Sequence, residues 1–415
     1  MKITKSLVAT MALLAMGATA NATETIYITG STAFRAATLN AVKSLLNNAN
    51  PTAQSNAAFT SSTAVNWMGV TYNGHTINVK ISLYGSVGGV QTVSESIAWP
   101  FLIDSATSAQ AQGEAFVAGS TTMTYYHDFQ VPTIAMSDTL QSSTPFNTTA
   151  LNDGVVGVVP FQWVASYGAS TSLNNVPTGL SMNNHLVNAI FSGGSAPLAQ
   201  ITGNSGDAAK SLFAIGRDAD SGTRLIAMAE AGYGATSTVA QFKPVTDTTA
   251  VLSHDYYPGA TINGIAYDPG NTGYNSGGTL AGMMRYETLT HLAGYYVTYL
   301  SKGDATAAVQ SGSTGTGNAV GLAWNGVNYY TGNTGTAGAA VFNTAAITSG
   351  QYTFWSYEHV LYPNQGSTTQ AFVFAPALVT AIKGTTSITG TASASGLNYF
   401  TMSVVRSGDG SYVTY

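Results

Sequence analysis

The sequence contains no cysteine, and it has few charged residues. Without cysteine the chain can form no disulfide and can carry no lipid on a thiol. Charged residues make up 7% of the chain, whereas ordinary soluble proteins have about 25%. Glycine, serine, threonine, asparagine and tyrosine are abundant instead. The surface must therefore consist largely of hydroxyl and amide groups.

Long hydrophobic runs are also missing, since no stretch approaches the ~18 consecutive apolar residues of a membrane helix. Lys2 and Lys5 precede a shorter apolar run over residues 7–16, which is followed by small residues. This order is typical of a cleaved secretory signal peptide. We therefore expect a signal peptide at 1–22 and a soluble protein that is periplasmic or secreted, with no membrane insertion.

The balance of charge is acidic, with 13 basic and 18 acidic residues and a formal net charge of −5. Loss of Lys2 and Lys5 with the leader would make the protein more negative. An acidic surface argues against nucleic acid or an anionic membrane as partner. A small anion can still bind wherever the site supplies local positive potential.

The length and the order of local patterns predict a two-lobed α/β protein. The chain has 415 residues, more than the ~250–300 at which a single core stops growing. Residues 24–29 have the pattern of a strand, a turn follows, and Phe34, Val42 and Leu45 then recur at helical spacing. A second strand-like segment at 77–83 runs into another glycine-rich turn. This alternation favours an open α/β sheet.

Further elements follow along the chain. We predict strands at 131–137, 155–165, 211–217, 318–324 and 371–379, and helices at 185–191, 223–234 and 280–300. Polar, glycine-rich stretches at 311–318 and 331–340 are interpreted as surface insertions. The tail after Gly384 has enough aromatic and branched residues for edge strands. The aromatic segment 353–363 is expected to pack in the core or between the lobes.

Three turns place glycine and hydroxyl residues where a helix is expected to begin. They are Gly30 to Thr32, Gly85 to Gly89 and Asp220 to Thr223. A helix N-terminus has free N–H donors and about half a positive charge, so it can bind an anion. The alternative for each turn alone is that its serine or threonine is a simple helix cap.

Two charged residues stand next to such turns. Arg217 precedes the third turn, and a guanidinium can hold an oxyanion through two parallel hydrogen bonds. Its alternative role is a surface ion pair with Asp218 or Asp220. Asp138 follows a predicted strand, where ligands of open sheets bind. Beside an anion a carboxylate makes sense only if the ligand carries a proton, as hydrogen phosphate does; otherwise Asp138 caps a turn.

Taken in order, these segments resemble one family, the periplasmic phosphate-binding proteins of phosphate ABC transporters. The family has a threonine in its first turn, a G-S-x-G-G turn, a Ser-Asp pair and an arginine followed by S-G-T. The resemblance implies a phosphate site formed by Ser31, Thr32, Ser86, Asp138, Arg217, Ser221, Gly222 and Thr223. The chain departs from the pattern at Ala219, where the family often has an aspartate that supports the arginine.

The resemblance also implies a type II periplasmic-binding fold with two crossover strands between the lobes. We place lobe 1 at 23–157 and 345–415, and lobe 2 at 158–344, with crossovers near 156–164 and 345–357. The protein would capture inorganic phosphate for an ABC-transporter permease as a monomer. Arg35, after the first turn, could add positive charge or form a salt bridge on its helix.

Other function classes have less support. The six histidines show no zinc-binding spacing, and no nucleophile elbow or phosphate-binding loop of NTPases is present. We therefore expect no enzyme activity, no cofactor and no metal. Two alternatives remain: a secreted structural or surface-associated protein on the same fold, and a binder of another oxyanion such as sulfate or molybdate.

Overall fold

The structure is a computed structural model that describes residues 23–112, 126–166, 180–246, 250–288, 294–310, 319–331, 341–364, 369–384 and 396–415. The expected signal peptide at 1–22 lies outside the described residues. The polar stretches at 311–318 and 332–340 lie outside them as well.

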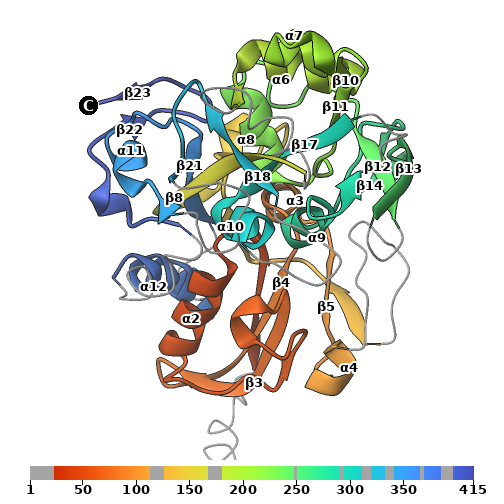
Figure 1. The fold of residues 1–415 in the computed structure, drawn as a ribbon. Helices are drawn as coiled ribbons and strands as arrows, with labels where there is room; N and C mark the ends of the chain where they lie inside the picture. Colours follow the sequence, from red (N-terminus) through yellow and green to blue (C-terminus); the bar gives the residue numbers. More distant parts are fainter. Residues whose placement is uncertain are drawn as a thin grey trace, which may run out of the picture.

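One large mixed sheet runs through the molecule (Figure 1). Its strands lie in the order β10-β11-β17-β8-β21-β7-β1-β4-β3-β2, with β18 paired to β8 and β9 paired to β18. The strands of this sheet are β1 (Glu24–Gly30), β2 (Ala53–Gln54), β3 (Ala64–Tyr72), β4 (His75–Leu83), β7 (Ile134–Ser137), β8 (Asn152–Ala165), β9 (Ser181–Met182), β10 (Ser195–Pro197), β11 (Ser211–Ala214), β17 (Gly294–Ser301), β18 (Val320–Trp324) and β21 (Trp355–Tyr362). The predicted mixed α/β class is confirmed.

Short strands form small separate pairs and one three-stranded sheet. They are β5 (Trp99–Leu102), β6 (His127–Gln130), β12 (Phe242–Thr246), β13 (Ala250–Tyr256), β14 (Ala260–Ile262), β15 (Ile265–Tyr267), β16 (Glu287–Thr288), β19 (Tyr330–Thr331), β20 (Val341–Phe342), β22 (Val405–Arg406) and β23 (Val413–Thr414). The pair β22 and β23 confirms the strands expected in the tail.

Helices cover the sheet on both sides (Figure 1). They are α2 (Arg35–Leu45), α3 (Ser86–Ser94), α4 (Ser108–Gln112), α6 (Asn184–Gly193), α7 (Leu198–Thr202), α8 (Gly222–Glu230), α9 (Gly277–Met283), α10 (Lys302–Gln310), α11 (Thr344–Thr348) and α12 (Gln370–Gly384). Four 3-10 turns are also described, at Phe59–Ser61, Gln141–Ser143, Ser205–Asp207 and Tyr399–Thr401. No helix in the described ranges is long and apolar enough to cross a bilayer.

Two strands join the two halves of the sheet. Strand β8 pairs with β21 over residues 152–160, and with β17 over residues 161–165. We call β7, β1, β4, β3 and β2 the first half-sheet, and β10, β11, β17 and β18 the second half-sheet. The predicted crossover at 156–164 falls within β8. The other predicted crossover, 345–357, covers most of α11 and the start of β21.

The direction of the strands brings three of the predicted site segments, those of Ser31, Ser86 and Asp138, to one edge of the sheet. Strands β4 and β7 both run parallel to β1, so their carboxyl ends lie at the same edge of the sheet. From the ends of β1, β4 and β7 the chain continues to Ser31, Ser86 and Asp138, respectively. The strand pairing therefore brings together turns that are far apart in the sequence.

Two sequence-based elements are wrong. The apolar segment 280–300 is not one helix, because α9 ends at Met283 and residues 294–301 form β17. Tyrosine and valine dominate that strand, and they favour a buried place between β11 and β8. The segment 371–379, predicted as a strand, lies in helix α12. Its buried residues Phe374, Leu378 and Ile382 follow helical spacing, a pattern that the continuous apolar run had obscured.

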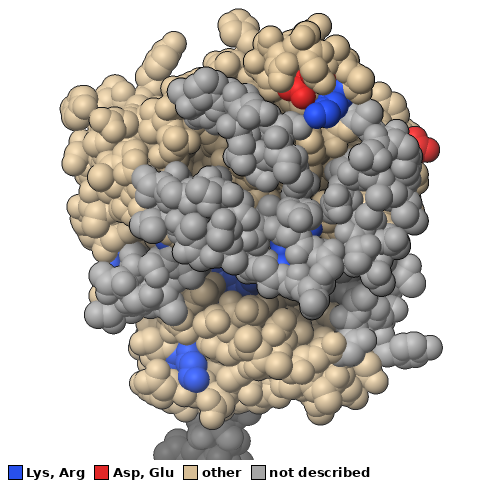
Figure 2. Space-filling model, in the orientation of Figure 1, with Lys and Arg blue, Asp and Glu red and all other residues tan. Residues whose placement is uncertain are grey.

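One continuous apolar core spans both half-sheets. The fully buried tryptophans Trp67, Trp163, Trp324 and Trp355 belong to it. Strand β21 is almost entirely buried, which confirms the packing expected for the aromatic segment 353–363. Figure 2 shows a face with few charges, on which several Lys and Arg atoms lie along the line between the upper and lower parts.

Candidate functional site

The first turn is held against the neighbouring strand. Gly30 has a φ of +105°, which L side chains rarely adopt, and an added Cβ would collide with the Met136 carbonyl. The Ser31 amide donates to that carbonyl at 2.7 Å. The Ser31 hydroxyl accepts from the Ala33 amide at 3.1 Å and donates to Glu358 Oε2 at 3.2 Å. Ser31 therefore acts both as a local turn residue and as a link to β21.

Thr32 is half-buried in the same turn. Its carbonyl accepts from the Arg35 amide at 3.4 Å. Within the described residues, no hydrogen bond joins its side chain to the other predicted site residues. Its part in the site stays a prediction.

The second turn meets Asp138. The Ser86 hydroxyl donates a short hydrogen bond to Asp138 Oδ1, and the Asp138 amide donates back to Ser86 Oγ at 3.2 Å. Helix α3 begins at Ser86, but its cap residue is Gly85, which makes no side-chain cap bond. The helix-cap alternative is therefore wrong for Ser86, whose hydroxyl is directed to the carboxylate.

The third turn reaches the same carboxylate from the other side. The Thr223 hydroxyl donates to Asp138 Oδ2 at 3.3 Å. An added Cβ on Gly222 would overlap Asp138 Oδ1 and lie 2.8 Å from the Ser86 Cβ. The structure thus brings Ser86, Asp138, Gly222 and Thr223 together, although they come from three separate segments.

Asp138 is a buried carboxyl, 2% exposed. Its turn is closed locally by Ser137, whose hydroxyl accepts from the Thr139 amide at 3.2 Å. The alternative that Asp138 is only a turn cap is therefore wrong. Burial raises the pKa of Asp138 to about 6, while the Ser86 hydrogen bond and then Arg217 act in the opposite direction.

Ser221 has the capping role that the sequence left open. It precedes helix α8, and its hydroxyl accepts from the Arg224 amide at 3.3 Å. Among the described residues, none accepts a hydrogen bond from the backbone N–H of Gly222 or Thr223. Both residues are buried, so this helix start offers donors in a shielded place.

Arg217 is 3% exposed, which rules out the surface ion pair. Its Nε donates to the Tyr274 carbonyl at 3.0 Å, and its Nη2 donates to the Asn275 carbonyl at 3.0 Å. These two bonds fix the plane of the guanidinium. Arg217 also lowers the pKa of Asp138, so the cation acts on the same site.

The two carboxyls beside Ala219 are buried as well. Burial raises the pKa of Asp218 to about 6. Burial and then the charge of Asp218 raise that of Asp220 to about 8. The Asp220 carbonyl accepts from the amides of Val87 at 3.0 Å and Gly88 at 3.3 Å. The backbone of the third turn is thus joined to helix α3 of the second turn.

Glu358 is a further residue of the site that no pattern in the sequence indicated. It lies on β21, it is fully buried, and it accepts from the Ser31 hydroxyl. Burial, and then the charge of Asp138, raise the pKa of Glu358 well above its usual range. A glutamate inside an aromatic strand segment was the available signal, because such a residue is almost never fully buried without a partner.

Arg35 does not form the salt bridge proposed for its helix within the described residues. It is half-buried, and its Nε donates to the Thr60 carbonyl at 3.4 Å. Burial lowers its pKa, while Asp304 acts in the opposite direction. Asp304 lies on α10, so Arg35 faces an element of the second half of the molecule.

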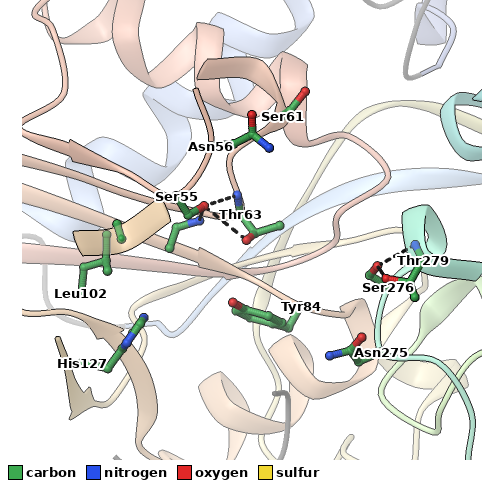
Figure 3. A pocket seen from close by; sticks show the side chains of 12 residues that line it. Ser55, Asn56, Ser61, Thr63, Tyr84, Leu102, His127, Asn275, Ser276 and Thr279 are labelled. Carbon is green, nitrogen blue, oxygen red and sulfur yellow. Dashed lines mark hydrogen bonds between the residues drawn. The ribbon is translucent and has the colours of Figure 1, made fainter. Parts of the chain in front are cut away.

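A polar cavity of about 270 Å³ lies near the site (Figure 3). Its lining includes Ser55, Asn56, Thr63 and Tyr84 on one side, and Asn275 and Ser276 on the other. Figure 3 shows Ser55 bonded to Thr63, and Ser276 bonded to Thr279. The predicted site residues do not line this cavity. It adjoins the site through Asn275, whose carbonyl accepts from Arg217.

Metal ligands are not clustered in the part of the chain that the structure describes, where no group of three or more histidine, aspartate or glutamate side chains could hold an ion. The side chains that the candidate site brings together are hydroxyls, the carboxyls of Asp138 and Glu358, and the Arg217 guanidinium.

A scan for known protein families finds no match for this chain, and no curated protein matches its sequence. Solved structures do match in shape. A protein from Clostridium perfringens, assigned as a phosphate ABC transporter substrate-binding protein and solved with phosphate, is 10% identical with a TM-score of 0.49. The alignment covers 90% of this chain and 99% of that chain.

An ABC-type phosphate transport receptor from Vibrio cholerae is 12% identical, with a TM-score of 0.46 over 90% of this chain and 99% of its own. An OxyR mutant from Corynebacterium glutamicum is 9% identical, with a TM-score of 0.36 over 91% and 71%. Because the identities are near 10% and the TM-scores are below 0.5, the function of this chain has to be inferred from its own residues.

Proposed function

We propose that this protein binds inorganic phosphate between its two half-sheets. The observation that carries the proposal is the position of Asp138. Its buried carboxylate accepts hydrogen bonds from Ser86 of one turn and from Thr223 of another, and Arg217 acts on it electrostatically. A proton acceptor, hydroxyl donors and a buried cation in one place match the groups of hydrogen phosphate.

Each group has a distinct task in this proposal. Asp138 accepts the proton of hydrogen phosphate, so fully ionised anions such as sulfate are repelled. Arg217 supplies the positive charge, and the amides of Gly222 and Thr223 donate to ligand oxygens. Thr32 and Ser221 contribute hydroxyls, and Ser31 and Ser86 do so when their hydroxyls turn from Glu358 and Asp138 to the ligand. No bond is made or broken in the ligand.

The lobes predicted from the sequence, 23–157 with 345–415 and 158–344, belong to this proposal. It is supported by the change of partners along β8 from β21 to β17. The tail also contacts the other lobe, since Arg406 pairs with Glu230 at 3.1 Å. Opening of the lobes by hinge motion would admit the ligand, and closure would strengthen its hydrogen bonds by excluding water.

The biological role follows from these assignments. We propose that the protein is exported, remains a monomer, captures phosphate and delivers it to an ABC-transporter permease. The expected leader and the resemblance of the four turns support this role.

A ligand panel tests the proposal. Calorimetry and thermal unfolding of the chain without residues 1–22 should show binding of phosphate, and of arsenate with its similar proton, but not of sulfate. A ligand that binds only the native state raises the melting temperature by mass action. Absence of phosphate binding at micromolar concentrations would refute the proposal.

Asp138→Asn tests the proton-acceptor role directly. We expect the variant to lose about 10- to 100-fold in phosphate affinity, because a charge-assisted hydrogen bond is lost. It should remain folded, since the asparagine oxygen can accept from one of the two hydroxyls and its amide can donate to the oxygen of the other. Asp207→Asn, which changes a buried carboxyl paired with Lys210, is the matched control. Normal phosphate binding by Asp138→Asn would contradict the assigned role.

A further inference from the structure

Glu358 occupies a special position on strand β21. The pairing of His359 with Ser137 on β7 places Glu358 beside Asp138. On the other side, the pairing with β8 shifts register between Glu358 and His359. Such an irregularity turns a side chain away from the regular alternation of the strand, and it is common next to binding sites.

Only one of the two Glu358 oxygens has a partner in the described part of the chain. Oε2 accepts from the Ser31 hydroxyl at 3.2 Å. Oε1 is buried and makes no hydrogen bond with any described residue. A buried polar atom without a partner is costly and requires an explanation. Ser31 is itself a predicted ligand residue, so the unpaired oxygen is at the site.

The charges around Glu358 favour its neutral form. Asp138, directly after β7, is the ionisable group that acts on it, and burial is the larger cause of its raised pKa. Its partners at the β1 turn and on β8, Ser31 and Gly157, carry no charge. A neutral carboxyl has an O–H that can donate a hydrogen bond, which an ionised carboxyl lacks.

We propose that Glu358 is a specificity-determining residue whose Oε1 hydroxyl donates to an oxygen of the bound anion while Asp138 accepts the anion's proton. The inference rests on the proposed phosphate site. Glu358 then donates to an unprotonated oxygen of the ligand, and Asp138 accepts from the protonated oxygen. The two together recognise a singly protonated phosphate.

Two substitutions separate this role from packing. Glu358→Met has a similar volume but no donor, and we expect phosphate affinity to fall about 10- to 100-fold. Glu358→Gln keeps an N–H donor without ionising, and it should cost only about two- to fivefold. Calorimetry at pH 7 measures both, circular dichroism verifies the fold, and Asp207→Asn serves as the control away from the site.

The outcomes distinguish this inference from the proposed function. If the wild-type protein binds no phosphate, the proposed function fails and the inference fails with it. If the wild-type protein binds phosphate and Glu358→Met binds equally well, only the inference fails. A tenfold or greater gain in Glu358→Gln would also overturn it, because it would mean that Glu358 is ionised and repels the ligand.

A spectroscopic test applies even if Glu358→Met does not fold. Infrared difference spectra of the wild-type protein, recorded on phosphate addition, should show the carbonyl band of a protonated carboxyl shifting. The band should be missing from Glu358→Gln and present in Asp207→Asn. A wild-type spectrum without such a band would overturn the inference.

Discussion

The two sides of the site are built from different chemistry. The side formed by β1, β4, β7 and β21 supplies hydroxyls and two buried carboxyls, Asp138 and Glu358. The side that precedes helix α8 supplies a guanidinium and free backbone amides. The first side alone would repel an anion, and the second alone would not distinguish one anion from another. In the proposed site, affinity and selectivity would therefore reside on different segments of the chain.

The two sides are also held in different ways. On the first side, the Ser86 hydroxyl donates to the Asp138 carboxylate and accepts from the Asp138 amide. Arg217 is fixed by the carbonyls of Tyr274 and Asn275. The carboxylate is therefore held by a side-chain hydroxyl, whereas the guanidinium is held by backbone carbonyls.

Removal of the cation should have the largest effect. We expect Arg217→Met to reduce phosphate affinity by at least ~100-fold, because loss of one partner of a buried charged contact is costly. Lys243→Met, at an exposed lysine, should leave binding unchanged in calorimetry. Arg217→Lys should retain part of the affinity, since lysine keeps the positive charge but cannot form the same set of hydrogen bonds as a guanidinium. Wild-type affinity in Arg217→Met would show that the third turn is not the source of positive charge.

The contact between the two sides can be widened without changing charge. Gly222→Ala should weaken phosphate binding about tenfold, because the new Cβ would overlap the Asp138 carboxylate and displace the turn. Gly282→Ala in helix α9 is the matched control, as nothing lies within 4 Å of its added Cβ. That control should bind normally and gain up to ~1 kcal/mol of stability. Equal affinities in the two variants would show that the close approach has no functional importance.

The smallest effect concerns pH and the carboxyl pair beside Arg217. The pKa of Asp220 is raised to about 8, above its usual value, so the free energy of unfolding should fall as pH rises from about 4 to about 8. Asparagine does not ionise, so Asp220→Asn should not show this fall in the free energy of unfolding. Without phosphate it should melt about 2–4 °C above the wild type at pH 8, with a smaller difference at pH 5.

Exposed Asp255→Asn is the control for the pH series, and it should follow the wild type. Thermal unfolding at pH 5, 6, 7 and 8 measures the three proteins. A constant difference between Asp220→Asn and the wild type across this range would mean that Asp220 does not titrate there.

Local patterns in the sequence predicted the elements whose periodicity is clear. Strands β7, β8, β11 and β18 and helices α6 and α8 lie where they were predicted. Strand β17 and helix α12 could not be predicted in this way, because both are continuous apolar runs whose conformation depends on their neighbours in the fold.

By itself, the sequence determined the scarcity of charge, the α/β class and the position of each turn, because these depend on composition and on residues close together in the chain. Tertiary structure decided which turns meet. The parallel pairing of β1, β4 and β7 brings Ser31, Ser86 and Asp138 to one edge. The carbonyls that hold Arg217, and the buried Glu358 beside Asp138, come from distant segments, so no local pattern could indicate them.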